Sequence, residues 1–497
     1  MFIKEIKITN FKCFSIRNNV LKCNIPNGID DGSGLNILVG NNNTGKSTVF
    51  EAVHFVREGA RKDVEDIKNY KALRKSSSDF NVEITLSDNI SDVIDKFAQE
   101  NKKEVIKRLI YKENGKEYLK LSRFFKDKKS AKAISLFNKA TAKYVNPSGI
   151  DAVVKKLFDM MFIWADTSSA DETKFGSTTI FGNLLQDIIE EIEEIEVYEK
   201  FKNTFNRTFN SSNSPLRSRI RQIGNKVESK LREQFDNVDL HFEFDPIDLK
   251  SIFKNIQIKV NDGVETLLDE KGSGLQRSLV IALLEVYAEE IANRHKSSKK
   301  SGNFSKPYFF FIDEPEICLH PLAQLKLLKA LITLSKERQI FITTHSPFFF
   351  KDTGIKNSAV FIFNKTSGKS NARIKKLTKN LGLFPWSPSW GEINYFAYNN
   401  PSVEFHDELY GYLKFRSHNY RESDFENFLS TNGISKSKVW QRDISRNQNP
   451  RRVTSQTFIR NKIHHPENRY MRNQNFSIDD LKQSIEEMIR IIKEKGY

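Results

Sequence analysis

The chain has 497 residues, of which 38% are hydrophobic and 29% are charged, and its formal net charge is +16 at pH 7. This length allows more than one hydrophobic core. The basic excess is typical of chains that meet nucleic acid, although a lysine-rich surface can also serve solubility alone. No window approaches the ~20 apolar residues of a membrane span, and the start Met-Phe-Ile-Lys-Glu lacks a secretory signal. Three cysteines form neither a disulfide framework nor a metal pattern, so we expect a cytoplasmic protein without membrane contact.

The first chemical motif follows an apolar run, Leu35 to Val39, which predicts a buried strand. Residues 40–47, Gly-Asn-Asn-Asn-Thr-Gly-Lys-Ser, fit a phosphate-binding loop, whose N–H groups form an anion nest at a helix N-terminus. Lys46 should reach the β- and γ-phosphates of ATP, and the Ser47 hydroxyl should ligate Mg²⁺. A chance glycine turn is the alternative, but the strand before the loop and the helical pattern after it disfavour that reading. The expected nucleotide-binding residues are Gly40, Asn41, Asn42, Asn43, Thr44, Gly45, Lys46, Ser47 and Thr48.

Beyond the helix that follows this loop, the sequence predicts another strand and then a long interruption. Asn81 to Leu86 has the apolar pattern of the strand, and it contains no glutamine. Residues 89–254 are rich in helical patterns but have no sustained heptads. We therefore expect a compact helical insertion that offers a surface to a second copy or another partner.

A pair of glycines opens a later helical pattern. The segment Gly272-Ser-Gly-Leu-Gln-Arg277 precedes apolar residues at helical spacing. The N-terminus of such a helix can donate N–H groups to a phosphate. The expected binding residues here are Gly272, Ser273, Gly274 and Gln276. A plain N-capped core helix is the alternative.

Two further apolar strands lead into candidate catalytic residues. Tyr308 to Ile312 precedes Asp313 and Glu314, and Gln339 to Thr343 precedes Thr344-His345. Asp313 can hold Mg²⁺ through water, and Glu314 can orient and deprotonate an attacking water. His345 can contact the γ-phosphate as a switch residue. The alternatives are a salt-bridged acidic pair and a histidine without a catalytic duty, and the phosphate-binding loop upstream disfavours both.

These motifs, in this order, resemble the ABC class of ATPases and, within it, the SMC-like and OLD-like branch of the AAA15/AAA21 type. Ile6 to Phe14 is similar to the first strand of those heads, and Glu316 to Pro321 is similar to the segment after their catalytic glutamate. The resemblance implies an α/β fold whose ABC-type head combines a mixed sheet with helices. It also implies a homodimer or higher homo-oligomer, in which the Gly272–Gln276 turn of one copy closes over the γ-phosphate held by Lys46 of another. The glutamine loop of that family has no assignable counterpart here.

The expected domains are residues 1–88 and 255–377 for the two lobes of the head, 89–254 for the helical insertion and 378–497 for a separate C-terminal domain. Val360–Phe363 and Ala372–Leu377 predict a hairpin that closes the head. The C-terminal domain is expected to be all-helical, with a last helix capped by Ser477. One face of that helix carries Ile478, Leu481, Ile485, Met488 and Ile492.

The C-terminal domain holds a strongly basic segment, Lys436 to Arg472. Ten Lys or Arg residues stand against two acidic ones, a net charge of +8 that is half of the chain's excess. Trp440, Phe458 and Tyr470 are interleaved with these charges. Phosphate attraction combined with aromatic stacking holds single-stranded RNA or DNA. A solvated basic loop explains the composition equally well.

The same segment contains Arg460-Asn-Lys-Ile-His-His465, which resembles the Arg-Asn-x-x-x-His motif of HEPN domains. These are small helical bundles that often act as metal-free RNases. The resemblance implies that Arg460 stabilises the charge of a phosphorane and that His465 serves as general acid or base. A structural Arg–His pair, or a bundle used for docking, is the alternative.

The layout of head, short insertion and basic helical tail resembles bacterial antiphage-defence ATPases of the AriA type of the PARIS system and the PtuA type of Septu. That resemblance implies a sensor or scaffold ATPase that controls a nuclease effector. A separate effector protein is expected, because residues 378–497 lack the acidic constellation of a TOPRIM nuclease. Two alternatives remain. One is an ATP-gated RNase with a fused HEPN-like domain, and the other is an SMC-like DNA-repair ATPase, against which the short insertion argues.

Overall fold

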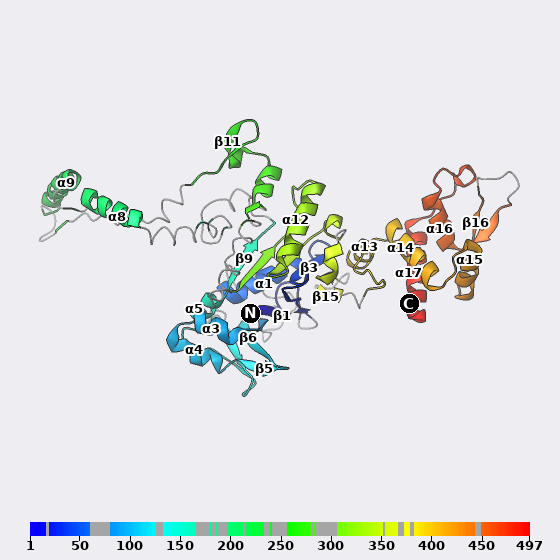
Figure 1. Cartoon of the computed structure of the whole chain (residues 1–497), viewed down its shortest axis with the longest axis horizontal. Helices are drawn as coiled ribbons and strands as arrows, with labels where there is room; N and C mark the ends of the chain where they lie inside the picture. The colour runs from blue at the N-terminus through cyan, green and yellow to red at the C-terminus, as the bar shows by residue number, and fades with distance from the viewer. Residues whose placement is uncertain are drawn as a thin grey trace. The chain divides into compact units, whose positions relative to one another are not determined.

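The structure is a computed structural model of the chain, and it separates into two compact units, Met1–Ala165 with Arg294–Tyr497, and Asp166–Asn293 (Figure 1). It describes residues 1–15, 19–59, 80–125, 133–165, 179, 182, 185, 196–209, 211, 214–232, 239–240, 256–280, 282–283, 286, 306–350, 353–365, 372–377, 382–442 and 449–497. Among these residues, no helix is both long and apolar enough to cross a membrane.

The first unit contains a mostly parallel sheet of six strands in its described part, in the order β15-β14-β3-β13-β12-β9. Five of the strands are parallel and β15 alone runs antiparallel to its neighbour β14. The strands at the centre are apolar runs that are buried on both faces, as parallel sheets require. Their bounds are β3 Leu35–Gly40, β9 Asp159–Ile163, β12 Tyr308–Ile312, β13 Gln339–Thr343, β14 Ala359–Lys365 and β15 Ala372–Leu377.

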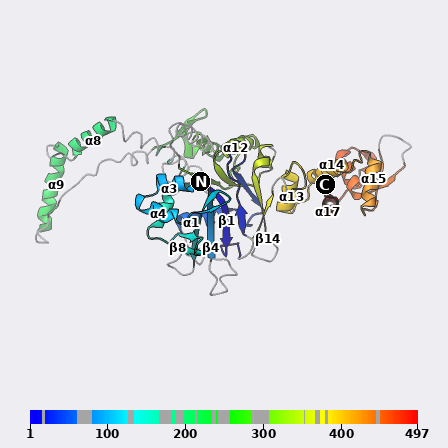
Figure 2. The ribbon, with the colours of Figure 1, turned by 60° about the horizontal axis from the view of Figure 1, so that its bottom comes forward.

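A second, antiparallel sheet has the order β2-β1-β4-β6-β7-β8, with β5 paired to β6 (Figure 2). One cluster of buried side chains joins both sheets to helix α1, Lys46–Glu58. The Gln339 amide adds a polar link, because it donates to Ile3 O at 2.7 Å and accepts from Ile3 N at 2.8 Å. The strands are β1 Phe2–Thr9, β2 Val20–Lys22, β4 Phe80–Ser87, β5 Tyr111–Glu113, β6 Lys116–Phe125, β7 Ser135–Asn138 and β8 Lys143–Val145.

Short helices complete this unit. In the head they are α3 Ile90–Phe97, α4 Glu100–Lys107, α5 Ile150–Leu157 and α12 Pro321–Leu334, with the 3-10 turns η4 Pro347–Phe350 and η5 Thr353–Asn357. The strand assignments at Leu35, Asn81, Tyr308 and Gln339 and the closing hairpin are confirmed, since each of these segments is a strand of one of the two sheets.

The expected helical insertion at residues 89–254 is wrong in its first half. Strands β5 to β9 lie between residues 111 and 163, and the second unit begins only at Asp166. Short apolar runs such as Met160–Ile163 do not distinguish a strand from a buried helix by periodicity, so the pattern alone misassigned them. In the second unit the described elements are α8 Glu196–Phe209, α9 Pro215–Arg232, β10 Lys259–Asn261, β11 Glu265–Leu267 and η3 Leu268–Glu270, together with a helical segment at residues 273–280.

The C-terminal domain belongs to the first unit and is built around its own buried cluster. It is not all-helical, because β16 and β17 pair as a short antiparallel hairpin. The last helix begins as expected, with a capping box between Ser477 and Asp480, but Ile478 is 73% exposed. Side chains tilt toward the helix N-terminus, so the first residue points beyond the packed face. The elements are α13 Trp390–Tyr398, α14 Val403–Arg416, α15 Glu422–Thr431, β16 Lys438–Trp440, β17 Arg451–Val453, α16 Ser455–His464, η6 Arg469–Met471 and α17 Ile478–Lys495.

Candidate nucleotide site

Three segments that are far apart in the sequence meet at one edge of the parallel sheet. Strands β3, β13 and β12 are neighbours and run in the same direction, so their carboxyl ends lie side by side. These ends lead into residues 40–47, 344–346 and 313–314. The crevice outside the carboxyl ends of such strands is where α/β proteins bind ligands.

The phosphate-binding loop needs its two glycines for different reasons. Gly40 has a positive φ of 150°, and a Cβ there would lie 2.2 Å from Phe363 O on the adjacent strand β14. Gly45 has φ 103°, and its Cβ would lie 2.5 Å from Cys13 Sγ. Any side chain at either position would therefore push the loop away from the strand or from the segment that follows β1.

Lys46 is the first residue of α1 and is held over the loop. Its ammonium donates to Gly40 O at 2.9 Å and to Asn41 O at 3.1 Å. Burial lowers the pKa of Lys46, and the carboxylates of Glu314, Asp313 and Glu316 oppose that shift. The loop thus presents a cation beside an anion nest, which is what a polyphosphate chain requires.

A chain of hydroxyl and carboxylate oxygens lies beside this lysine. Ser47 Oγ donates to Asp313 Oδ1 at 3.0 Å, and Thr343 Oγ1 donates to the same oxygen. These hard oxygen donors fit a cation such as Mg²⁺, which prefers one or two protein oxygens together with phosphate oxygens and water. The described residues hold no cluster of three or more His, Cys, Asp and Glu suited to a metal, so a cation here would rely on the nucleotide for its remaining ligands.

Glu314 is fixed by its backbone and leaves its carboxylate partly open to solvent. Its φ of 46° is in the left-handed region, and its N–H donates to Thr343 Oγ1 at 2.9 Å. Non-glycine residues rarely adopt this conformation, and such strain collects at functional sites. Burial raises the pKa of Glu314, with Asp313 adding to the shift and Lys46 opposing it. A raised carboxylate pKa makes a better general base than an ordinary carboxylate.

His345 faces Glu314 across the same edge. Its Nε2 lies 3.5 Å from Glu314 Oε1, and both side chains are about one-third exposed, at 31% and 30%. Burial, assisted by the positive charge of Lys46, lowers the pKa of His345 to about 4. The imidazole is therefore neutral near pH 7 and can donate one hydrogen bond to a phosphate oxygen without carrying charge.

Glu316 has a positioning role that the sequence did not reveal. Its Oε1 accepts from the Thr344 hydroxyl at 2.8 Å and from His345 N at 2.6 Å. Burial raises its pKa, and these hydrogen bonds oppose the shift. Glu316 thus ties the turn after β12 to the turn after β13. The sequence signal available for Glu316 was the presence of an acidic residue two positions after Glu314. No sequence signal marked Thr343, which lies at the end of strand β13.

Comparisons with known proteins agree with this geometry. Residues 1–350 match the model of the AAA ATPase domain family AAA_15, which is more than half of the chain. The chain belongs to the AAA_15 family of ATPase domains. It is an enzyme of the ATPase type with an α/β head.

Individual relatives of this AAA ATPase are more distant. The Old nuclease of Escherichia phage P2 is 29% identical over 321 residues, which is 62% of the chain and 52% of that protein, so the chain spans about half the length of this relative. An SMC head domain from Thermotoga maritima is 15% identical with a TM-score of 0.34, covering 76% of the chain and 99% of the other. The SMC head bound to the C-winged helix domain of ScpA is 13% identical with a TM-score of 0.41, at the same coverage.

The second glycine motif of the AAA ATPase lies in the other unit. Residues 273–280 form a helix, and Gly272 and Ser273 at its start are exposed. A Cβ on Gly272 would meet nothing within 4 Å, and its φ is not in the left-handed range. The Gln276 amide donates to Leu268 O and Lys271 O at 3.1 and 2.8 Å, so its amide group holds the preceding turn.

The C-terminal residues expected to cleave RNA are arranged differently from the sequence expectation. Arg460 donates to Asn461 Oδ1 at 3.1 Å, whereas His465 is exposed beside Glu467, with 3.4 Å between Nδ1 and Oε1. The neighbouring His464 pairs instead with Asp407 of α14, at 2.9 Å from Nε2 to Oδ2. Burial raises the pKa of Asp407, and the charges of His464 and Arg460 oppose the shift.

The aromatic residues of the basic segment do not form a stacking surface. Trp440 and Phe458 are each only 2% exposed and meet edge to face at 6.1 Å in the domain core. Tyr470 is exposed at 53%. The expectation of three interleaved stacking residues is therefore wrong for two of them, because large aromatic side chains in a small helical domain are needed to fill its core.

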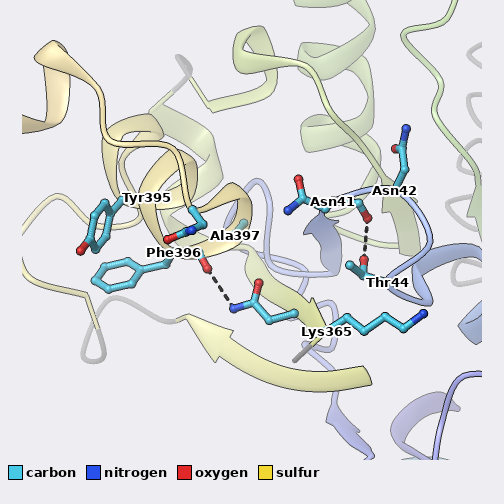
Figure 3. Close-up of a pocket in the computed structure, with 9 residues that line it drawn as sticks. Asn41, Asn42, Thr44, Lys365, Tyr395, Phe396 and Ala397 are labelled. Atoms are coloured by element: carbon cyan, nitrogen blue, oxygen red, sulfur yellow. Dashed lines mark hydrogen bonds between the residues drawn. The ribbon is translucent and has the colours of Figure 1, made fainter. Parts of the chain in front are cut away.

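A cavity of about 600 Å³ lies beside the phosphate-binding loop (Figure 3). One wall is the loop and the other is helix α13 of the C-terminal domain. Asn364, at the end of β14, crosses to that helix by donating to Phe396 O at 2.9 Å. The lining residues are Asn41, Asn42, Thr44, Asn364, Lys365, Tyr395, Phe396, Ala397 and Asn399.

Proposed function

We propose that this AAA ATPase hydrolyses ATP with Mg²⁺ in a composite site between two copies, and that it serves in the cytoplasm as the sensor or scaffold subunit of a bacterial antiphage defence system. In this role it controls a separate nuclease effector. The observation that carries the proposal is the meeting of Lys46, Ser47, Asp313, Glu314 and His345 at one sheet edge. P-loop NTPases use this set of groups to bind and cleave a nucleoside triphosphate.

The residues act on ATP in defined ways. Ser47 and Asp313 would hold Mg²⁺, and the ion would neutralise negative charge on the phosphates. Glu314 accepts a proton from water as the water oxygen bonds to the γ-phosphorus, and the bond from that phosphorus to the bridging oxygen breaks, leaving ADP. Lys46 balances charge on the departing phosphate, and neutral His345 donates a hydrogen bond to the γ-phosphate.

The composite site rests on the exposed helix start at Gly272 and Ser273. A variant Ser273→Arg puts a long cation on this open surface, so we expect the protomer to fold but not to close over a second copy's nucleotide. Mixing this variant with Lys46→Ala should restore part of the ATPase rate, because a mixed dimer keeps one intact Lys46 opposite one intact helix start. ATPase assays of each variant alone and of the mixture test this. A mixture as inactive as its parts contradicts the composite site.

Trapping the nucleotide gives an independent test. The Glu314→Gln variant should bind ATP without hydrolysing it and should accumulate as a dimer or larger species. Light scattering with ATP, and with ADP as control, measures the mass directly. A mass that stays at that of a single chain with ATP contradicts the composite site. Lys46→Ala should lose ATP binding in a nucleotide titration, and Lys329→Ala, at an exposed site on α12, is the matched control.

The defence role is supported only by the resemblance of the layout and by the match to the Old nuclease. The test is infection: cells that carry the gene with its neighbouring genes should resist phage, and Lys46→Ala should abolish resistance. Pull-down of the tagged chain should recover a nuclease encoded beside it. Resistance that survives Lys46→Ala contradicts an ATP-dependent sensor.

One observation favours a second candidate, an ATP-gated RNase. The Asp407–His464 pair lies within electrostatic reach of Arg460 in a basic domain, and a histidine held by a carboxylate is suited to proton transfer. If this candidate holds, cleavage of a tRNA pool is lost in His464→Ala and kept in His418→Ala, a histidine on the same domain's surface. Loss in His465→Ala alone favours the assignment made from the sequence. Among the described residues nothing favours the third alternative, an SMC-like DNA-repair ATPase.

A further inference from the structure

Helix α13 joins the C-terminal domain to the nucleotide-binding head. It packs against β3 and β14, the strands that lead into and flank the phosphate-binding loop. Trp390, at its start, stacks on Phe350 of η4 with ring centres 5.6 Å apart. Near its end, Phe396 O accepts the hydrogen bond from Asn364 of β14. The helix is therefore fixed to the head at both ends.

Tyr398, the last residue of α13, reaches the nucleotide site itself. Its hydroxyl donates to Thr344 O at 3.3 Å, and its ring centre lies 5.8 Å from that of His345. The helix stops there because Asn399 adopts a left-handed conformation, with φ 52°. The backbone carbonyl that Tyr398 holds belongs to the residue directly before the switch histidine.

The surroundings keep this tyrosine a neutral hydrogen-bond donor. Burial raises its pKa well above the ordinary value, the charges of Glu316 and Glu314 add to the shift, and the backbone of Gly40 opposes it. Its hydrogen bond places the hydroxyl at the turn after β13, directly before His345. It is the one side chain of α13 that the described contacts place there.

We propose that Tyr398 is a positioning residue through which the C-terminal domain sets the rate of ATP hydrolysis. The hydroxyl holds Thr344, and Glu316 holds Thr344 and His345 from the other side, so the histidine is fixed between the head and the C-terminal domain. A displacement of α13 releases one of these two restraints. This inference rests on the proposed function, because it requires hydrolysis at this edge.

The interface between α13 and the head combines buried contacts with an open cavity. The cavity of about 600 Å³ lies between the C-terminal half of α13 and the phosphate-binding loop (Figure 3), whereas Ile393 in the first half of the helix is fully buried. The buried cluster around α1 and the buried cluster of the C-terminal domain share no residue. The hydrogen bonds from Asn364 to Phe396 O and from Tyr398 to Thr344 O are the directional contacts through which a displacement of α13 would reach the head.

The test removes only the hydroxyl. In the full-length chain, Tyr398→Phe should lower kcat roughly fivefold with little change in KM, which is the size expected for the loss of one neutral hydrogen bond. Tyr420→Phe is the matched control, since it removes a hydroxyl from an exposed position of the C-terminal domain, where its partner is His418 Nδ1 at 3.4 Å. The control should keep the wild-type kcat, and both variants should keep the wild-type melting temperature.

Two outcomes separate this inference from the proposed function. If wild-type turnover is no greater than that of Lys46→Ala, the proposed function fails and this inference fails with it. If wild-type turnover depends on Lys46 but Tyr398→Phe equals the wild type in kcat and KM, this inference alone is overturned. A Tyr398→Phe chain that melts earlier and loses activity only through unfolding also overturns it.

Fluorescence gives a readout that a purely structural role would not move. The Trp390 ring lies 6.0 Å from Tyr398, so its emission should report the position of α13. The difference between the spectra of the wild type and Trp390→Phe isolates this signal. A non-hydrolysable ATP analogue should change it in the wild type and change it less in Tyr398→Phe. An unchanged signal in the wild type contradicts the coupling.

Discussion

The nucleotide edge of the head and the Arg460–His465 region of the C-terminal domain were both recognised from short motifs, and they differ in how the fold treats those motifs. At the nucleotide edge, segments from three strands come together, and Ser47 meets Asp313 across 266 positions of sequence. On α16, the motif residues are close in sequence, yet His465 faces solvent and His464 makes the link to another helix.

The difference teaches when a motif predicts a site. Parallel strands deliver their carboxyl ends to one edge whatever lies between them, so the ends of apolar strands are informative even when far apart. A helix places neighbours in different directions, because each residue turns by about 100°. A motif confined to a helix terminus therefore shows which residues lie close to one another. It does not show which of them contacts a residue of another element.

The largest expected effect tests the nucleotide edge. Glu314→Gln removes the general base but keeps the size of the side chain, so we expect kcat for ATP hydrolysis to fall about 10²- to 10⁴-fold. Steady-state phosphate release measures it, and Glu337→Gln, at an exposed site on the same unit, is the control. A fall of less than about tenfold would show that Glu314 is not the base.

The next effect tests the reassigned aromatic residues of the C-terminal domain. Trp440→Ala removes a buried ring and should destabilise that domain by about 3–5 kcal/mol. Hydrogen exchange of the amides in α16 and α17 measures the loss of protection. Tyr470→Ala, at an exposed site, should change the free energy of unfolding by less than ~0.5 kcal/mol. If Trp440→Phe loses nucleic-acid binding while the amides of α16 and α17 keep their protection from exchange, Trp440 does stack on nucleic acid.

The pH dependence of hydrolysis sharpens the roles of Glu314 and His345. The pKa of Glu314 is raised, so its basic form is lost as the pH falls through a value above the ordinary 4.5. The pKa of His345 is lowered to about 4, so it stays neutral through 6.5. We expect kcat to show no inflection near pH 6.5 and to fall at lower pH, by up to about tenfold per pH unit. An inflection near 6.5 that disappears in His345→Gln would contradict the neutral histidine.

The smallest effect concerns a feature that the sequence alone predicted in the C-terminal domain. Ser477 accepts from Asp480 N at 3.0 Å, and the Asp480 carboxylate accepts from Ser477 N at 2.9 Å. Ser477→Ala should destabilise the start of α17 by about 1 kcal/mol. Amide exchange in the first turn measures this. Ser423→Ala, on the exposed face of α15, should leave amide exchange in that turn unchanged. An equal effect of the two variants would show that the Ser477 cap does not stabilise the start of α17.

Sequence patterns were most informative where one physical requirement dominates. The runs Tyr308–Ile312 and Gln339–Thr343 are observed as strands with those bounds, and short apolar runs between polar turns are typical of strands buried on both faces. Met160–Ile163 is equally apolar but was placed in a helical insertion. The sheet pairs Asp159 of β9 with Tyr308 of β12, which lies almost 150 positions later in the sequence. No local sequence signal marks a pairing between segments that far apart.

The chemistry of the chain was determined by the sequence: glycines where the loop must turn, a lysine and serine at the start of a helix, and carboxylates and a histidine after apolar strands. The fold decided which groups meet. Thr343, Glu316 and Tyr398 hold the nucleotide edge through hydrogen bonds whose partners belong to other strands or to another domain. The amino-acid sequence determines which chemical groups the chain carries. Which of these groups become neighbours depends on the order of the strands in the sheet and on the packing of α13 against the head.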